Sequence, residues 1–154
     1  MDIADLLTVR GVIAQLRASN KRQALQEIAR RGTALTGISE RRIYDALAER
    51  ERSGSTGIGQ GIALPHGKLA ELPRLCGLFA RLERPIPFEA IDNQPVDLLF
   101  VLLAPAAAGA AHLRALARVS RLLRDAATCQ KLRGTDKSDA LYALLTDNTE
   151  INAA

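Results

Sequence analysis

The feature that most constrains the fold is a nearly unbroken apolar run over residues 96–103, Val-Asp-Leu-Leu-Phe-Val-Leu-Leu, closed by Ala104 and Pro105. A strand with one face in water alternates polar and apolar residues, whereas a strand covered on both faces shows no such alternation. Residues 76–83 alternate loosely enough for a second strand, which we expect Pro85 and Pro87 to stop. The chain therefore needs covering layers on both sides of at least one central strand.

Helical signals before this run supply one set of candidates for those layers. An N-cap at Ser19 or Asn20 predicts a helix to about residue 31, and Gly32 is expected to stop it. Ser39 predicts the start of a second helix, which ends near residue 52 before a glycine-rich stretch begins.

Two more helices are predicted after the run. One covers about residues 110–125, and the other follows Asp136, which with Asp139 resembles a capping box. The expected inward positions are His112, Leu116, Val119 and Leu123 in the first of these helices, and Leu141, Leu144 and Leu145 in the second.

Composition sets the size and character of the core. Of 154 residues, 47% are hydrophobic and only 3% are aromatic, so one domain can bury a full core that is mostly aliphatic. A short N-terminal segment at about residues 3–13 precedes the first helix. Together these elements predict an α/β fold, a mixed β-sheet sandwiched between helix layers, in a single domain over residues 1–154 with its core at about 3–147.

The charge balance is basic without a binding patch. The net charge is +4 and the isoelectric point about 9.5, but the arginines are spread among acids along the helical segments. Aromatic side chains that could stack on bases are scarce. We therefore expect a solvated basic surface and no nucleic-acid partner.

Cysteine usage and hydropathy indicate the compartment. Cys76 and Cys129 are far apart and outside any paired motif, which favours small buried hydrophobes in a reducing environment. The N-terminus lacks a signal-peptide pattern, and the longest apolar stretch, residues 98–108, is too short to span a bilayer. We expect a soluble cytoplasmic protein with no membrane insertion.

The glycine-rich segment over residues 54–68, Gly-Ser-Thr-Gly-Ile-Gly-Gln-Gly-Ile-Ala-Leu-Pro-His-Gly-Lys, is the candidate for chemistry. Its glycines could expose N–H donors to an anion, yet their spacing matches neither the dinucleotide fingerprint nor the P-loop. Taken alone, the glycines more simply indicate a bent strand pair.

The two histidines of the chain favour a functional interpretation of this segment over a purely structural one. Pro65 fixes the backbone before His66 and Gly67 leaves the ring uncrowded, a way to present an imidazole rather than bury it. His112 falls in the first turn of its predicted helix, where the partial positive charge disfavours imidazolium and attracts anions. His112 could donate to a phosphate oxygen or simply belong to the apolar helix face, and the sequence weights both interpretations equally.

Other reaction classes are poorly supported. Two histidines without an acid-rich motif make a weak zinc site, and no nucleophile elbow is present. What remains is phosphoryl transfer in which neutral His66 attacks phosphorus and nearby donors stabilise the oxygens, with neither metal nor cofactor. Arg50 and Arg52 could instead be solvated helix ends. The candidate donors are Arg50, Ser55, Thr56, His112 and the backbone N–H groups of Gly57, Gly59 and Gly61.

At these residues the sequence resembles enzyme IIA proteins of the fructose/mannitol class of the bacterial phosphotransferase system, nitrogen-regulatory branch. The resemblance rests on Arg50-Glu51, Gly54-Ser-Thr-Gly-Ile-Gly, Gly61-Ile-Ala-Leu-Pro-His-Gly-Lys68, Ile91-Asp-Asn-Gln-Pro-Val-Asp-Leu-Leu-Phe100 and His112-Leu113. It implies that His66 is phosphorylated on Nε2 by an HPr-like phosphocarrier, and that Arg50 and His112 bind the phosphoryl oxygens. The fold it implies is the mixed sheet between helix layers predicted above.

The resemblance also frames the role of the chain. The absence of a fused IIB or membrane domain favours a regulatory protein acting on an unidentified target, although residues 106–111 are almost all Ala and Gly where polar residues are expected. One alternative is a sugar-transport IIA subunit that passes phosphate to a IIB domain. A non-enzymatic alternative is a basic binding protein whose glycine loop is purely structural.

Overall fold

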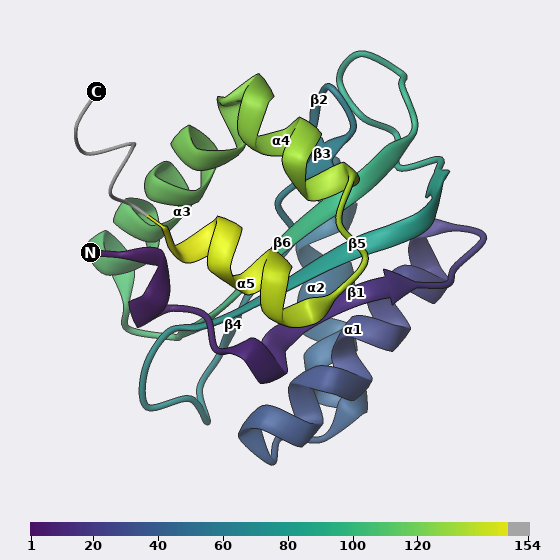
Figure 1. Cartoon of the computed structure of the whole chain (residues 1–154). Coiled ribbons are helices and arrows are strands. Elements are labelled where there is room, and N and C mark those ends of the chain that lie inside the picture. The colour runs from purple at the N-terminus through teal and green to yellow at the C-terminus, as the bar shows by residue number, and fades with distance from the viewer. Residues whose placement is uncertain (148–154) are drawn as a thin grey trace.

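In the computed structural model, residues 1–147 form a six-stranded mixed sheet and five α-helices (Figure 1). Two 3₁₀ turns, Ile3–Asp5 and Val9–Gly11, precede the first strand. The strands are β1 (Val12–Leu16), β2 (Gly57–Gly59), β3 (Ile62–Ala63), β4 (His66–Leu69), β5 (Cys76–Ile86) and β6 (Val96–Pro105). The helices are α1 (Lys21–Thr36), α2 (Glu40–Arg52), α3 (Gly109–Arg124), α4 (Ala126–Arg133) and α5 (Ser138–Thr146).

The sheet is built around β6. Its strand order is β1-β5-β6-β3-β2, and β4 pairs with β6 further along the same edge as β3. β5 runs antiparallel to β6, while β3 and β4 run parallel to it. Since β3 and β4 share one edge of β6, the short link between them brings the glycine-rich segment and His66 onto the central strand.

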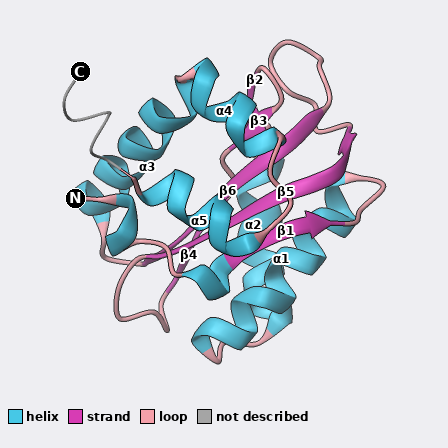
Figure 2. Ribbon diagram, viewed as in Figure 1, coloured by secondary structure: helices cyan, strands magenta, loops and turns pink. Residues whose placement is uncertain are grey.

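Helices cover both faces of this sheet, as Figure 2 shows: α1 and α2 pack on one side and α3, α4 and α5 on the other. The predicted central strand is confirmed, because every residue from 98 to 104 is buried. Its side chains alternate between the two cores. Leu99, Val101 and Leu103 join the α1–α2 core, and Leu98, Phe100 and Leu102 join the core under α3, α4 and α5.

The predicted helix starts at Asn20 and Ser39 are confirmed. The Asn20 side chain accepts from the Gln23 N–H, and the Ser39 side chain accepts from the Arg42 N–H. The predicted stop at Gly32 is wrong. Gly32 lies inside α1, where an added Cβ would stand 3.0 Å from a methyl carbon of Ile43, so it permits close packing of α2 on α1.

Other predicted boundaries also change. β5 continues through Pro85 to Ile86. Its last pair with β1 is at Leu82, and its pairing with β6 is irregular between residues 81 and 86. The N–H that Pro85 lacks would therefore not have made a regular hydrogen bond of the sheet. The capping box at Asp136 does not form. α5 begins at Ser138, which places Asp136 one residue before the N-cap position, and no side chain caps that helix.

Three elements escaped prediction, and β4, which begins at His66, is one of them. β1 lies partly within the N-terminal segment that carried no strand assignment. α4 follows α3 directly, with Asp125 both ending α3 and accepting from the Thr128 N–H at the start of α4. A single residue that ends one helix and caps the next leaves no loop signal between them.

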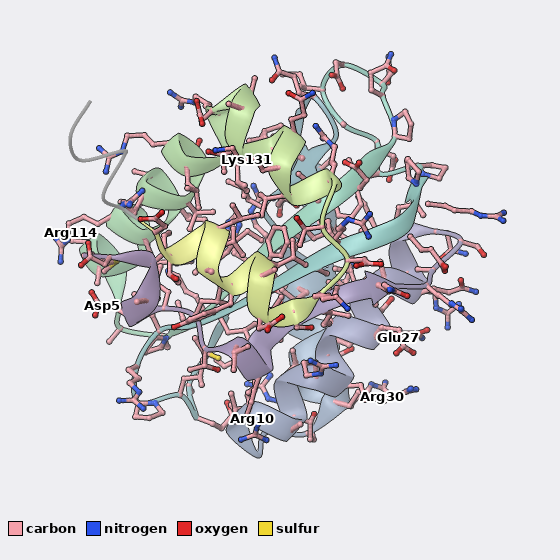
Figure 3. All side chains as sticks on the ribbon, viewed as in Figure 1. Asp5, Arg10, Glu27, Arg30, Arg114 and Lys131 are labelled. Carbon is pink, nitrogen blue, oxygen red and sulfur yellow. The ribbon has the colours of Figure 1, made fainter. Side chains whose placement is uncertain are left out.

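Charged side chains are dispersed over the surface. In Figure 3 the labelled charged residues are spread over the view, with Arg114 and Asp5 at the left, Arg10 at the bottom, Glu27 and Arg30 at the lower right, and Lys131 on the upper helices. Arg30 pairs with Glu27 at 3.2 Å and with Glu40 at 3.4 Å. Positive charge is thus interleaved with negative charge. Within residues 1–147, no helix is both long and apolar enough to cross a bilayer.

Candidate functional site

His66 opens β4 and is held there by close packing. The Leu102 N–H of β6 donates to the Pro65 carbonyl at 3.0 Å, which fixes the backbone just before the ring. Gly67 is buried against α2, and an added Cβ would lie 3.1 Å from backbone and side-chain atoms of Ala46. We expected Gly67 to leave the ring uncrowded. Its observed contact is instead the close approach of β4 to α2, which brings His66 within reach of Arg50.

The hydrogen bonds of His66 define its tautomer. Nδ1 lies 2.8 Å from the Leu64 carbonyl oxygen, which can only accept, so Nδ1 carries the proton. Nε2 then has its lone pair free to accept, and it receives the Arg50 Nε–H at 3.2 Å. The result is a neutral imidazole with its basic nitrogen turned toward a cation.

Arg50 is held at both ends of its guanidinium. Besides the bond to His66, its Nη1 donates to the Gly54 carbonyl at 2.8 Å. Arg50 lies in the last turn of α2, where the helix dipole favours a cation. The alternative of a merely solvated helix end does not describe this side chain, because both of its contacts are to ordered protein groups.

His112 faces His66 from the other side of the sheet edge. The ring centroids are 5.4 Å apart and the planes meet at 77°. His112 is only 6% exposed, and its Nε2 is the one buried side-chain nitrogen or oxygen in residues 1–147 without a hydrogen-bond partner. Buried polar atoms are nearly always paired, so this nitrogen is poised for a group that is not part of the chain.

The surroundings keep both rings neutral. Burial lowers the pKa of His66, and the Arg50 charge lowers it further, while the Leu64 carbonyl and Glu51 oppose the shift. Burial is also the main cause that lowers the pKa of His112, followed by repulsion from His66 when that ring is protonated and by the charge of Lys68. Both imidazoles are therefore uncharged at neutral pH.

An open cavity of about 620 Å³ contains these groups. Its floor is β4, one wall is the outward face of α2, and the start of α3 forms the rim, with Leu113 70% exposed. Arg42 in the wall is committed to Glu71 through two bonds of 3.0 Å. The lining residues are Arg42, Asp45, Ala46, Glu49, Arg50, Ser53, His66, Gly67, Lys68, Gly109, His112, Leu113 and Leu116.

The structure brings His66, Arg50 and His112 together, but not the five predicted loop donors. Ser55 Oγ donates to the Phe88 carbonyl at 2.6 Å, and Thr56 donates through both its N–H and its hydroxyl to Glu51. Neither residue lines the cavity. Their side chains hold the turn after α2 instead of facing His66.

The glycines of the loop form the strand pair β2–β3, as the simpler interpretation predicts. Gly57 is packed so closely on Ala90 that an added Cβ would lie 2.8 Å from it, and Gly59 lies against Asp92. Gly61 lies against Arg133 and Asp97. All three are outside the cavity lining, so close backbone packing accounts for their lack of side chains.

Sequence reasoning missed Lys68 as part of the cavity. The signal was present, because His66 and Lys68 are two apart on a strand and so share a face. It singled out Arg50 but missed Arg42, Ala46 and Ser53, which share its face of α2 at helical spacing. Among the described residues, no group of three or more His, Cys, Asp or Glu side chains is arranged to hold a metal ion.

A neutral histidine beside a second imidazole and an arginine, carried by a mixed α/β sheet, is an arrangement that can accept a phosphoryl group. Residues 5–148 match the family model described as "Phosphoenolpyruvate-dependent sugar phosphotransferase system, EIIA 2", and the chain belongs to this enzyme IIA family. Proteins of this kind pass phosphate from phosphocarriers to other proteins.

The particular branch follows from individual relatives. The chain is 50% identical over 145 residues to a nitrogen regulatory protein of Bradyrhizobium diazoefficiens, covering 94% of this chain and 95% of the relative. It is 40% identical over 148 residues to that of Escherichia coli K12, covering 96% and 91%. It is a phosphoryl-accepting protein of the nitrogen-type phosphotransferase system.

Solved structures agree. The crystal structure of nitrogen regulatory protein IIA-Ntr from Neisseria meningitidis superposes with a TM-score of 0.88 at 29% identity, covering 94% of this chain and 99% of that one. The IIA mannitol protein of Escherichia coli has a TM-score of 0.75 at 19% identity, covering 90% and 97%, and shows the same fold. The predicted fold class is confirmed by both matches.

Proposed function

We propose that His66 accepts a phosphoryl group on Nε2 from the phosphohistidine of an HPr-like phosphocarrier, in the cytoplasm, and that the phosphorylation state of the chain regulates a target protein. The tautomer of His66 carries this assignment. Because the Nδ1 proton is held by the Leu64 carbonyl, Nε2 is the ring nitrogen that carries a lone pair, and at rest this lone pair accepts the Arg50 Nε–H. Both His66 and Arg50 line the cavity.

The transfer balances without a metal or an added base. The Arg50 Nε–H, which the Nε2 lone pair accepts at rest, turns to the phosphoryl oxygens and frees that lone pair. The lone pair then attacks phosphorus in line, the phosphorus–nitrogen bond of the donor breaks, and its electron pair returns to the donor imidazole. His66 keeps its Nδ1 proton throughout. The Leu64 carbonyl, 2.8 Å away, then stabilises the positive charge that grows on the ring as the new bond forms.

Arg50 and His112 are the proposed groups for the phosphoryl oxygens. The Arg50 guanidinium already lies at Nε2, so its N–H groups are beside the position of an incoming phosphoryl group. The unpaired Nε2 of His112, as a neutral N–H donor, gains through that group the hydrogen bond it otherwise lacks. Ser55, Thr56 and the loop glycines are not included, because their contacts lie elsewhere.

The start of α3 supports an anion at the same place. Gly109 lines the cavity, and the N-cap residue Ala108 offers no side-chain acceptor to the first turn. The helix dipole therefore favours negative charge in front of His112. The small residues before this helix leave that approach unobstructed.

Labelling tests the assignment. The chain is incubated with phosphoenolpyruvate, enzyme I and the HPr-like carrier, and we expect one acid-labile, base-stable phosphate that is absent from His66→Ala. Label that persists in the variant would show that another residue is the acceptor. Thermal unfolding of the same variant checks that loss of label does not come from loss of fold.

The sugar-transport alternative has its own test. The chain is 31% identical over 146 residues to part of the fructose-specific EIIABC component of Bacillus subtilis, so transfer to a IIB domain is the competing fate of the phosphate. Candidate IIB proteins are added to the labelled chain. Retained label supports the regulatory role, whereas rapid loss coupled to sugar uptake would overturn it.

A further inference from the structure

Glu51 is a buried carboxylate next to the site that the phosphoryl chemistry above does not use. Its side chain is 6% exposed, and it lies one residue before the end of α2. A negative charge is unfavourable both in the interior and at a helix C-terminus. It does not line the cavity, so its position needs an explanation other than contact with the phosphoryl group.

The contacts of Glu51 join the end of α2 to the start of the next loop. Its two oxygens accept the Thr56 backbone N–H at 3.0 and 3.2 Å, and one of them also accepts the Thr56 hydroxyl. Lys21, at the start of α1, lies 3.3 Å away and supplies the opposite charge. The Lys21 ammonium is itself held 4.5 Å above the ring of Phe88.

The turn closed by these bonds carries the second anchor of Arg50. The N–H groups of residues 53 and 54 donate back to α2, from Ser53 to the Arg50 carbonyl at 3.2 Å and from Gly54 to the Glu51 carbonyl at 3.1 Å. The Gly54 carbonyl then accepts Arg50 Nη1 at 2.8 Å. The direction of that carbonyl therefore depends on how firmly the far end of the turn, Thr56, is tied down.

We propose that Glu51 and Thr56, balanced by Lys21, are positioning residues for phosphoryl transfer. They fix the turn whose Gly54 carbonyl holds the Arg50 guanidinium against Nε2 of His66. The inference rests on the proposed function of His66. Neither side chain touches the reacting atoms, so their effect is transmitted through Arg50.

The direct test is Thr56→Val, which keeps the shape of the side chain and removes the hydroxyl bond to Glu51. We expect phosphoryl transfer to slow by about tenfold to a hundredfold, because small misplacements of catalytic groups cost rates of that order. The NMR signal of the Arg50 Nε–H is expected to change, and His66 to titrate at higher pH as the cation loosens. The charged groups that affect His66 are Arg50, Glu51 and His112, all of which remain in this variant. Thr56→Ser restores the hydroxyl and should restore the rate.

Thr128 offers a matched control. Its N–H and hydroxyl also donate to a single carboxylate, that of Asp125, at the start of α4 and outside the cavity lining. Thr128→Val loses the same type of hydrogen bond, so its transfer rate and its Arg50 signal are expected to match the wild type. An equal slowing of transfer in Thr128→Val would mean that the effect is general destabilisation and would overturn the proposal.

Other outcomes are equally decisive. Thr56→Val with wild-type transfer and an unchanged Arg50 signal rejects the positioning role. If Thr56→Val does not fold, Glu51→Gln takes its place, since it keeps the size of the side chain and removes its charge. Its criteria are the transfer rate and the Arg50 signal alone, because the Glu51 charge directly raises the pKa of His66. The Arg50 signal is measured without any phosphocarrier. The Arg50 signal therefore tests the positioning role independently of labelling. A wild-type chain that takes no label at His66 would reject the proposed function instead.

Discussion

The two ends of the segment from residue 54 to residue 68 look alike in sequence but differ in how their polar groups are satisfied. At the β2–β3 end, Arg133 donates to Asp97 at 2.8 and 2.9 Å and to the Gln60 carbonyl at 2.8 Å, which ties the hairpin to α4 and β6. At the β4 end, the rings of His66 and His112 meet across an open cavity, and the Nε2 of His112 has no partner.

The difference separates a structural use of glycine from a functional one. Gly61 has no side chain because Arg133 and Asp97 fill the space where one would be. Gly67 has none because β4 must approach α2 closely enough to bring His66 to Arg50. Substitutions at the first end should therefore cost stability alone, whereas substitutions at the second should cost phosphoryl transfer.

The largest expected effect is that of His112→Ala at the functional end. Loss of a donor to the phosphoryl oxygens should slow transfer to the chain by about 10²- to 10³-fold. The free energy of unfolding should change by only about 1 kcal/mol, because the substitution also removes an unpaired buried nitrogen. Single-turnover labelling measures the first quantity and denaturant unfolding the second. Transfer at the wild-type rate would remove His112 from the site.

At the structural end, Gly61→Ala should destabilise the fold without slowing transfer. Gly61 has φ +82°, and an added Cβ would lie 2.6 Å from Arg133 Nη2 and 2.8 Å from Asp97 Oδ1. We expect a loss of about 2–3 kcal/mol in unfolding free energy from strain and overpacking together. Gly37→Ala is the matched control. At φ +76° with no atom within 4 Å of the added Cβ, it should lose only about 1 kcal/mol.

Both variants are then labelled under the conditions used for the wild type. Equal labelling rates among the three proteins support a structural role for the β2–β3 glycines. Slower transfer in Gly61→Ala at a temperature where it is fully folded would return this glycine to the phosphoryl site.

Gly67→Ala should combine both kinds of effect at intermediate size. Its Cβ would stand 3.1 Å from Ala46, so β4 must shift from α2 by a few tenths of an ångström. We expect a loss of about 1 kcal/mol in stability and about a tenfold slower transfer, as His66 moves relative to Arg50. In Gly134→Ala the nearest atoms would be 3.6 Å away, an ordinary contact, so it serves as the control for both measurements. Unchanged transfer in Gly67→Ala would show that the spacing of β4 and α2 is not critical.

The sequence predicts the parts of this molecule that depend on local pattern. The unbroken run in β6, the caps Asn20 and Ser39, and the inward face of α3 are periodic or capping signals, and all are confirmed. The roles of Gly32 and Gly61 were not predictable, because each depends on a residue of another element, Ile43 of α2 or Arg133 of α4, that fills the missing side-chain space.

The candidate site also contains residues that the sequence predicts and residues whose role depends on the fold. Arg50, His66 and His112 could be singled out by residue type and by their place at helix ends or beside proline. The destination of Thr56 could not, because a hydroxyl beside a glycine loop looks like a phosphate donor until the fold turns it toward Glu51. A hydrogen-bonding side chain in a sequence has several possible partners, and only tertiary structure selects one.

The smallest expected effect is a pH dependence of stability between pH 7.5 and 5.5, a range in which the histidines of the functional end titrate. The pKa values of His66 and His112 are lowered in the folded protein, mainly by burial and further by the cations Arg50 and Lys68, against the opposing charge of Glu51. In the unfolded chain both rings take up protons near pH 6.5. Below that pH the unfolded state therefore binds more protons, so stability falls as the pH is lowered.

Between pH 7.5 and 5.5 we expect His66 to contribute a loss of up to about 1 kcal/mol in unfolding free energy, allowing for its partial exposure. Denaturant unfolding of the wild type and of His66→Gln at the two pH values measures it, and the variant should lose less. If the two curves of stability against pH are parallel, His66 is solvated like an ordinary surface histidine. The two ends of the segment would then differ in their hydrogen bonds but not in the burial of a titratable ring.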